Sequence, residues 1–275
     1  MAVTTFIPSV WSETLLTQLD REYIGVANCN REFEGEIKGQ GSVVNIGSIG
    51  EIEIFDYTKN VDMMAPKELT SEEMTLTIDQ AKAFNFQIDD IDRIQAKPNL
   101  MQAAMKEAAG ALANVADQFI YSLWAQANEN NCITVDNVTP DNIIDTVVSA
   151  RRQLLTNGVN SNVSTALEIS PEVAAVLLRA KILSDTDNTE SLENGLIGKL
   201  IGFDVYVSSN ISVVDDRHKC LARTKRAVAF AEQVNEVEAY RPESRFADAL
   251  KGLHLYGAKL VYPKEYVVLD IGFGA

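Results

Sequence analysis

The chain has 275 residues, of which 39 are acidic and 24 basic, so its formal net charge is −15. An acidic chain repels phosphate groups, which argues against a protein that binds DNA or an anionic membrane through its overall electric field. Hydrophobic residues make up 46% of the sequence, enough for a folded core. No apolar run reaches the roughly 20 residues that span a bilayer, so we expect no membrane contact.

The first predicted element is a short helix over residues 10–24. Trp11, Leu15 and Leu19 follow each other at intervals of four residues, which places them on one face. We expect Trp11 to pack against another surface, because an exposed tryptophan near a chain terminus is unusual.

Residues 31–58 change to the alternating pattern of strands in a hairpin, interrupted by five glycines. Residues 56–73 then show little periodicity, and a loop that long in a compact domain is usually disordered or functional. Strand alternation returns at residues 74–78 and 84–88. A hairpin this long and rich in glycine is hard to bury within its own domain.

A long helix is predicted over about residues 98–128. Pro98 suits a first helical turn, and apolar residues recur every three or four positions from Met101 to Leu123. Seven alanines in this stretch favour helix and permit close packing. The helix is much longer than the average of about 11–12 residues.

The rest of the chain interleaves helices and strands, which indicates an α/β layer over residues 139–236. Thr139-Pro140-Asp141 and Ser170-Pro171-Glu172 are typical helix starts, and Asn157-Gly158 is a typical helix end. The glycine-containing stretch 195–202 is interpreted as a turn. Strands are predicted at residues 166–169, 203–207, 227–230, 237–240, 254–261 and 266–271.

Candidate chemical sites are few. Cys29, Cys132 and Cys220 are too sparse for a disulfide framework or a zinc pair. Of the two histidines, we expect His254 to be structural, since leucines flank it on a strand, and His218 to lie solvated in a polar turn. No nucleophile elbow, zinc helix or phosphate loop is present, so we predict no cofactor, no resident metal and no enzymatic activity.

Two charged groups leave alternatives open. Asp89, Asp90 and Asp92 could bind Mg²⁺ or Ca²⁺, although Asp89 is equally placed to cap a helix. Arg223, Lys225 and Arg226 could contact nucleic acid, but no aromatic residues are interleaved with them, which favours a solvated strand face.

The order of several segments resembles the major capsid proteins of tailed double-stranded-DNA bacteriophages, which have the Hong Kong 97-type capsid fold. The resemblance is carried by residues spread over the whole chain. They are Gly41-Ser42-Val43-Val44-Asn45-Ile46 with Asp56-Tyr57 and Leu69-Thr70, Phe84 to Asp92 before the long helix, Gly202 to Ser208, Phe230 to Gln233, Val237 to Glu243, Phe246 and Gly252 to Lys259.

The resemblance implies an α+β fold with four parts. Residues 1–33 would be an N-arm, residues 34–80 an extended loop lying over a neighbouring subunit, residues 81–137 and 237–262 a peripheral domain with its spine helix, and residues 138–236 and 263–275 an axial domain.

The implied function is structural. Such a chain self-assembles through pentamers and hexamers into an icosahedral shell around double-stranded DNA, is located in the virion and is made in the host cytoplasm. The implied partners are other copies of the chain, a separate scaffolding protein, a portal and, as an open option, a decoration protein. Two alternatives remain: an encapsulin-like nanocompartment shell and an acidic metal-dependent enzyme using the three aspartates.

The uneven charge suggests where copies could meet. The first 220 residues hold 32 acidic and 16 basic side chains, whereas the last 55 hold 7 and 8. Acidic residues of the extended loop could therefore pair with basic residues of the C-terminal part in another copy. The predicted subunit contacts are Trp11, Glu51, Glu53, Lys59, Lys67, Glu68, Arg241, Arg245 and Lys251.

Overall fold

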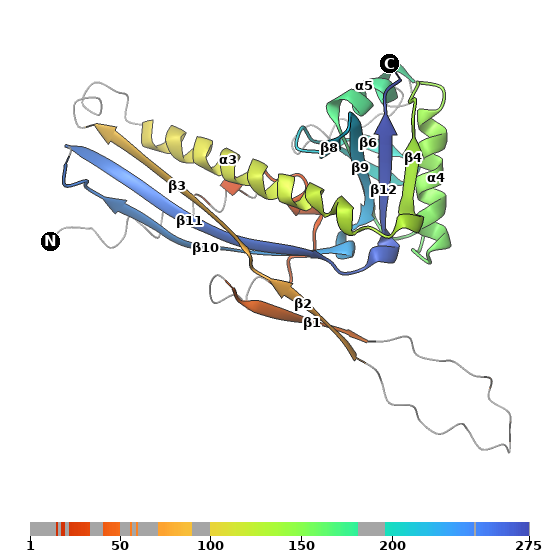
Figure 1. Cartoon of the computed structure of the whole chain (residues 1–275), viewed down its shortest axis with the longest axis horizontal. Helices are drawn as coiled ribbons and strands as arrows, with labels where there is room; N and C mark the ends of the chain where they lie inside the picture. The colour runs from red at the N-terminus through yellow and green to blue at the C-terminus, as the bar shows by residue number, and fades with distance from the viewer. Residues whose placement is uncertain are drawn as a thin grey trace.

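The computed structural model describes residues 15, 18–19, 22–33, 41–49, 56, 59, 71–89, 100–180, 196–244 and 246–274. Figure 1 shows two sheet-containing parts, one elongated and one compact, with a hairpin that projects away from both. No helix among these residues is long and apolar enough to cross a membrane.

The compact part is built on a seven-stranded sheet within the described residues, with order β4-β12-β9-β5-β7-β6 and β8 paired to β9. The helices α4 and α5 belong to this part (Figure 1). Its strands are β4 Cys132–Val135, β5 Thr165–Ile169, β6 Leu196–Leu200, β7 Phe203–Val207, β8 Val213–Val214, β9 Arg217–Thr224 and β12 Tyr266–Gly272; its helices are α4 Ile143–Thr156 and α5 Pro171–Arg179.

The predicted α/β layer is confirmed up to β9, whereas residues 228–236 belong to the elongated sheet. The helix start predicted at Thr139-Pro140-Asp141 is wrong, because Pro140 and Asp141 lie in a turn and α4 begins at Ile143 after Asn142.

The predicted start at Ser170 and the predicted end at Asn157-Gly158 are confirmed. The Ser170 hydroxyl accepts a hydrogen bond from the Val173 amide at 3.4 Å, with Pro171 in the first turn. Gly158 follows α4 with a φ of 92°, a conformation that glycine adopts without strain. The turn predicted at residues 195–202 is wrong for its first part, which forms β6; the turn is at Ile201–Gly202.

The elongated part is a three-stranded antiparallel sheet with order β10-β11-β3, and α3 runs along it (Figure 1). The strands are β3 Gln80–Asp89, β10 Val228–Tyr240 and β11 Ala247–Leu260. The two separate strands predicted at 227–230 and 237–240 are one strand, because a bulge between Val234 and Glu236 carries the pairing across the polar residues between them.

The long helix is confirmed as α3, Leu100–Ser122, although its predicted start at Pro98 lies outside the described residues. The predicted last turn is a 3₁₀ helix, η3 Leu123–Gln126, rather than α-helix. Other short 3₁₀ turns are η1 Val26–Asn28, η4 Glu129–Asn131, η6 Lys225–Ala227 and η7 Pro263–Glu265.

The projecting hairpin pairs β1, Val43–Ile49, with β2, Ser71–Thr77, in antiparallel register. The base of the hairpin packs on the three-stranded sheet, because alternate residues of its strands point toward that sheet. Four buried residues at the base join four residues of the main body in a small apolar cluster that is separate from the main core: Val44, Ile46, Leu76 and Ile78 with Ala229, Ala231, Leu255 and Val261.

Alternate residues of the sheet serve its two faces. Phe230 and Tyr256 belong to the main core, where Tyr256 packs edge-on against Phe119 of α3 at 5.6 Å between ring centroids. Ala229 and Ala231 point the other way, toward the hairpin base. The same strands therefore hold both the helix and the hairpin.

At Gly257 the sheet backbone lies close to the base of the hairpin. A Cβ atom there would lie 2.3 Å from the carbonyl oxygen of Thr77, at the end of β2. Only glycine permits this approach of two backbones.

We predict that Gly257→Ala destabilises the subunit by about 1–3 kcal/mol, because the hairpin base must move. The measurement is chemical denaturation followed by circular dichroism. Gly110→Ala is the matched control: nothing lies within 4 Å of its Cβ, and it sits in α3, so this change should stabilise by about 0.5–1 kcal/mol. Equal stability of Gly257→Ala and the unchanged chain would contradict the close approach.

Candidate assembly interface

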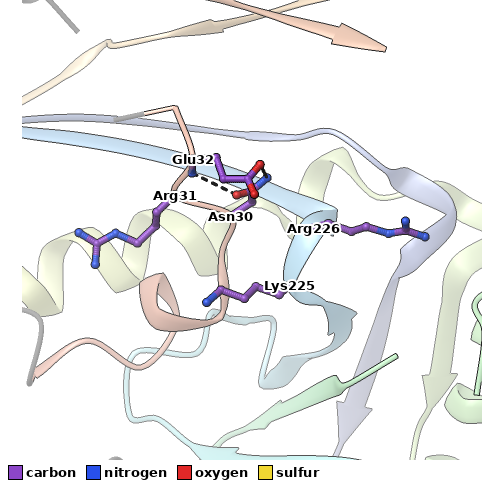
Figure 2. Close-up of a pocket in the computed structure, with 5 residues that line it drawn as sticks. All are labelled: Asn30, Arg31, Glu32, Lys225 and Arg226. Atoms are coloured by element: carbon purple, nitrogen blue, oxygen red, sulfur yellow. Dashed lines mark hydrogen bonds between the residues drawn. The ribbon is translucent and has the colours of Figure 1, made fainter. Parts of the chain in front are cut away.

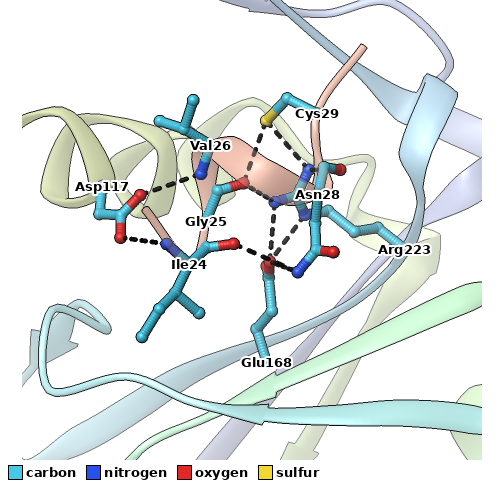
Figure 3. A network of polar contacts seen from close by, with 8 residues as sticks. All are labelled: Ile24, Gly25, Val26, Asn28, Cys29, Asp117, Glu168 and Arg223. Atoms are coloured by element: carbon cyan, nitrogen blue, oxygen red, sulfur yellow. Dashed lines mark hydrogen bonds and ion pairs between the residues drawn. The ribbon is translucent and has the colours of Figure 1, made fainter. Parts of the chain in front are cut away.

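The two parts of the subunit meet around residues 23–31. Figure 3 shows this segment between α3 and the strands of the compact sheet, with polar side chains pointing toward it from both.

Arg223 on β9 and Glu168 on β5 form a fully buried ion pair. Nε of Arg223 lies 2.9 Å from Oε2 of Glu168, Nη2 lies 2.8 Å from Oε1, and both side chains are 0% exposed. The guanidinium also donates to the carbonyl oxygens of Gly25 at 2.7 Å and Asn28 at 2.8 Å. The solvated strand face predicted for Arg223 is wrong: it is Lys225 and Arg226, on the next turn, that face solvent.

Asp117 of α3 holds the same segment from the other side. Its carboxylate accepts hydrogen bonds from the backbone amides of Ile24 at 3.0 Å and Val26 at 2.9 Å. Burial raises the pKa of Asp117 to about 6, although these amide hydrogen bonds oppose the rise. Because the pKa is higher in the folded state, proton binding to Asp117 stabilises the folded state. This stabilisation is complete below the unfolded pKa of 3.8 and is lost as the pH rises through about 6.

A second buried cluster ties the segment to the elongated sheet. Glu232 on β10 accepts from the Tyr23 hydroxyl, from Arg31 at 2.6 Å and from Nε2 of His254 at 2.8 Å. Burial alone would raise the pKa of Glu232, but the hydrogen bond and charge of His254, with Tyr23 and Arg31, hold it below its usual range. The structural role predicted for His254 is confirmed.

An open pocket of about 500 Å³ lies beside the segment and is lined by Asn30, Arg31, Glu32, Lys225 and Arg226. Figure 2 shows that Arg31 and Arg226 extend in opposite directions. Each is paired to a carboxylate that does not line the pocket, Arg31 to Glu232 at 2.6 Å and Arg226 through Nε to Glu265 at 2.8 Å. The basic side chains therefore do not converge on one anion.

The predicted contact residues are only partly described. Lys59 is exposed. Arg241 lies 3.5 Å from Asp248, and Lys251 lies 2.7 Å from Glu238, so both bases have acidic neighbours on adjacent strands of their own chain. The remaining six, Trp11, Glu51, Glu53, Lys67, Glu68 and Arg245, lie outside the described residues.

Phe246 was not predicted as a contact residue. It lies in the connection between β10 and β11 and is 86% exposed, the most exposed large hydrophobic residue among those described. It follows the polar sequence Arg241-Pro242-Glu243-Ser244-Arg245, so no periodic apolar pattern marked it in the sequence.

The candidate metal site finds no support in the described residues, which contain no group of three side chains able to hold a metal ion. Asp89 is the last residue of strand β3, and Asp90 and Asp92 lie outside the described residues. His218 is in strand β9 with its side chain 12% exposed against Phe273, so the solvated turn predicted for it is wrong. That turn is formed by Asp215 and Asp216, which both have positive φ.

The signal for the junction residues was present in the sequence. Glu168, Arg223 and Glu232 each interrupt an apolar strand, in Ala-Leu-Glu-Ile, Leu-Ala-Arg-Thr and Phe-Ala-Glu-Gln. A charge inside a strand that is buried on both faces needs an opposite charge or several hydrogen bonds. The presence of these three charges in apolar strands would have indicated buried ion pairs, but it would not have indicated which residues pair with each other.

Comparison with known proteins identifies the class. A family model described as phage capsid protein matches residues 72–269. A solved structure titled Mycobacterium phage Che8 is 28% identical to this chain with a TM-score of 0.69, and the alignment covers 90% of each chain. A capsid of Ralstonia phage GP4 has the same TM-score at 10% identity, covering 94% of this chain and 91% of that one. No curated protein matches.

The family model covers well over half of the chain, so the protein belongs to the phage capsid protein family. It is a structural protein of the phage capsid and not an enzyme. The α+β architecture and the structural likeness confirm the predicted Hong Kong 97-type capsid fold.

We predict that Arg223→Met costs about 3–5 kcal/mol of folding free energy, because it leaves Glu168 charged and unpaired in the core. Denaturant titration measures the loss. Adding Glu168→Met should restore part of it, since the orphaned charge is removed. Lys251→Met breaks an ion pair whose side chains are 51% and 55% exposed and should cost below about 1 kcal/mol. A similar small cost for Arg223→Met would show that the buried pair is not what stabilises the junction.

Proposed function

We propose that the chain self-assembles through pentamers and hexamers into an icosahedral shell that encloses double-stranded DNA. Family membership supports a shell protein, and the projecting hairpin is the observation that supports assembly through overlapping copies. Among the described residues, the base of the hairpin packs on its own subunit through four apolar side chains. The rest of residues 34–80 would lie over a neighbouring subunit.

The proposal extends to partners and place. A separate scaffolding protein, a portal and, in some shells, a decoration protein would act with the chain, which would be made in the host cytoplasm before it enters the virion. The net charge of −15 fits a container wall, because a wall that bound phosphates tightly would hinder the packing and release of DNA.

We also propose the division into N-arm, extended loop, peripheral domain and axial domain, with two boundaries moved. β4 pairs with β12 in the compact sheet, so the peripheral domain would end before Cys132. All of β10 pairs with β11, so residues 228–236 would join the peripheral domain rather than the axial one.

An encapsulin-like nanocompartment remains the second candidate. A virus-like particle from Pyrococcus furiosus has a TM-score of 0.58 at 14% identity, covering 96% of this chain and 100% of that one, a likeness of fold alone. A nanocompartment would enclose protein cargo instead of a genome.

The test is to purify the particles that the chain forms in its infected host and to image them by electron microscopy. The proposal predicts closed shells whose contents are double-stranded DNA that resists nuclease until the shell is broken. Shells that hold protein cargo without DNA would favour the nanocompartment, and a chain that remains a monomer would contradict both.

Arg241 and Arg245 are the bases proposed to meet acidic residues of a neighbour's extended loop. Arg241→Glu with Arg245→Glu should reduce shell yield at least tenfold while circular dichroism and the thermal midpoint stay near those of the unchanged chain, because like charges then face each other across the contact. Particle counts from gel filtration and microscopy measure this.

Lys199→Glu is the control. Lys199 is 69% exposed, lies 3.4 Å from Asp204 and belongs to the compact part, away from the proposed contact. Normal shells from the double variant, or an equal loss from Lys199→Glu, would remove the charge-pairing proposal.

A further inference from the structure

The segment 23–31 hydrogen-bonds to both parts of the subunit within nine residues. Toward the compact sheet, the carbonyl oxygens of Gly25 and Asn28 accept hydrogen bonds from Arg223. The side-chain amide of Asn28 donates a hydrogen bond to Glu168 at 3.0 Å. Toward the elongated part, Ile24 and Val26 donate to Asp117. The polar side chains converge on the segment from the two sides (Figure 3).

The end of the segment continues onto the elongated sheet. The Asn30 amide donates to the Val228 carbonyl at 2.8 Å, and the Phe230 amide donates to the Asn30 carbonyl at 2.9 Å, which makes Asn30 a parallel bridge to the edge of β10. Tyr23 and Arg31 both bind Glu232 on the same strand. The segment is therefore bonded at its middle to β9 and β5 and at both ends to β10.

The two parts also share the main apolar core, which contains Ile120 of α3 as well as Leu167 of β5, and they are joined by short connections. The chain passes between them after α3, through η6 between β9 and β10, and through η7 between β11 and β12. Connections of this kind can act as hinges, since a few backbone dihedrals absorb a rotation. In addition, Asn210 of the compact part donates a hydrogen bond to Asn114 of α3 at 2.9 Å and accepts one from Gln118 of α3 at 3.4 Å. These hydrogen bonds are exposed, so water competes for the same groups.

We propose that residues 23–31 act as a clasp that fixes the angle between the compact sheet and the elongated part of the subunit. Its bonds to Asp117 and to the Arg223–Glu168 pair are buried and charge-assisted, so they stabilise one orientation much more than the exposed Asn210 contacts do. Because residues before 23 continue directly into the clasp, any contact they make with another molecule is coupled to the shape of the subunit.

The test measures the angle and the clasp separately in the full-length chain. Spin labels at Gln87→Cys on β3 and Arg152→Cys on α4, in a Cys132→Ser background and diluted into unlabelled chain, report the distance between the two parts. Hydrogen exchange of the amides of residues 24–28 reports the clasp. Gln87 and Arg152, the two residues replaced for labelling, are both exposed.

Asp117→Asn is the informative variant, because an amide has one acceptor oxygen where the carboxylate offers two. We expect exchange of the Ile24 and Val26 amides to rise at least tenfold and the distribution of distances between the labels to broaden. Asn28→Ala, which removes the amide bond to Glu168, should act in the same direction. Glu107→Gln makes the same chemical change at an exposed position of α3 and should alter neither readout.

Two outcomes would overturn the clasp. If exchange rises in Asp117→Asn while the distance distribution stays as narrow as in Glu107→Gln, the segment does not set the angle. If exchange stays unchanged in both Asp117→Asn and Asn28→Ala, these bonds are not what holds the segment. Neither readout requires shells, so failure here is separate from failure of the proposed function.

Discussion

The buried pair of Arg223 and Glu168 is the interaction on which the arrangement of the subunit depends. A guanidinium in a dry core is tolerated only if its donors are met, and here the carboxylate of Glu168 and two carbonyls of the N-terminal segment meet them. Folding of the compact sheet and docking of residues 23–31 are therefore linked, because without the segment the arginine would lose the carbonyl acceptors of Gly25 and Asn28.

The elongated sheet packs against a long helix on one face and against the base of the projecting hairpin on the other. Large residues such as Phe230 and Tyr256 fill the helix side, and small ones, Ala229 and Ala231, leave room for the hairpin base. Gly257 lets the hairpin leave the sheet at close range. The same sheet therefore anchors α3 on one face and the described base of the hairpin on the other.

Local signals in the sequence predicted much of this fold. The α3 stripe, the cap at Ser170 and the stop at Asn157-Gly158 depend on neighbouring residues only, and each is found where it was expected. The strands β4, β6, β8 and β9 and the first half of β11 were missed, because strands there are defined by partners distant in sequence rather than by their own alternation. The single strand β10 was divided in two because its bulge and polar middle hide the pairing with β11.

The junction could be predicted least. Arg223, Glu168 and Asp117 come from three elements, and the segment they bind comes from a fourth, so no spacing along the chain reveals that they meet. The charge count was informative at a coarser level: it excluded a protein that binds nucleic acid through its overall field, and it drew attention to the C-terminal bases. Among those bases, the structure singles out Arg223 as part of the core and shows acidic neighbours for Arg241 and Lys251 within the chain.

A reconstruction of the assembled particle by electron cryomicroscopy, at a resolution that shows side chains, tests the central claim most directly. The account predicts a closed shell in which the hairpin of residues 43–77 from each subunit lies against a second copy, while the Arg223–Glu168 pair and residues 23–31 stay joined within one subunit. A hairpin folded back onto its own subunit, or an Arg223 that binds a carboxylate of another copy, would contradict it.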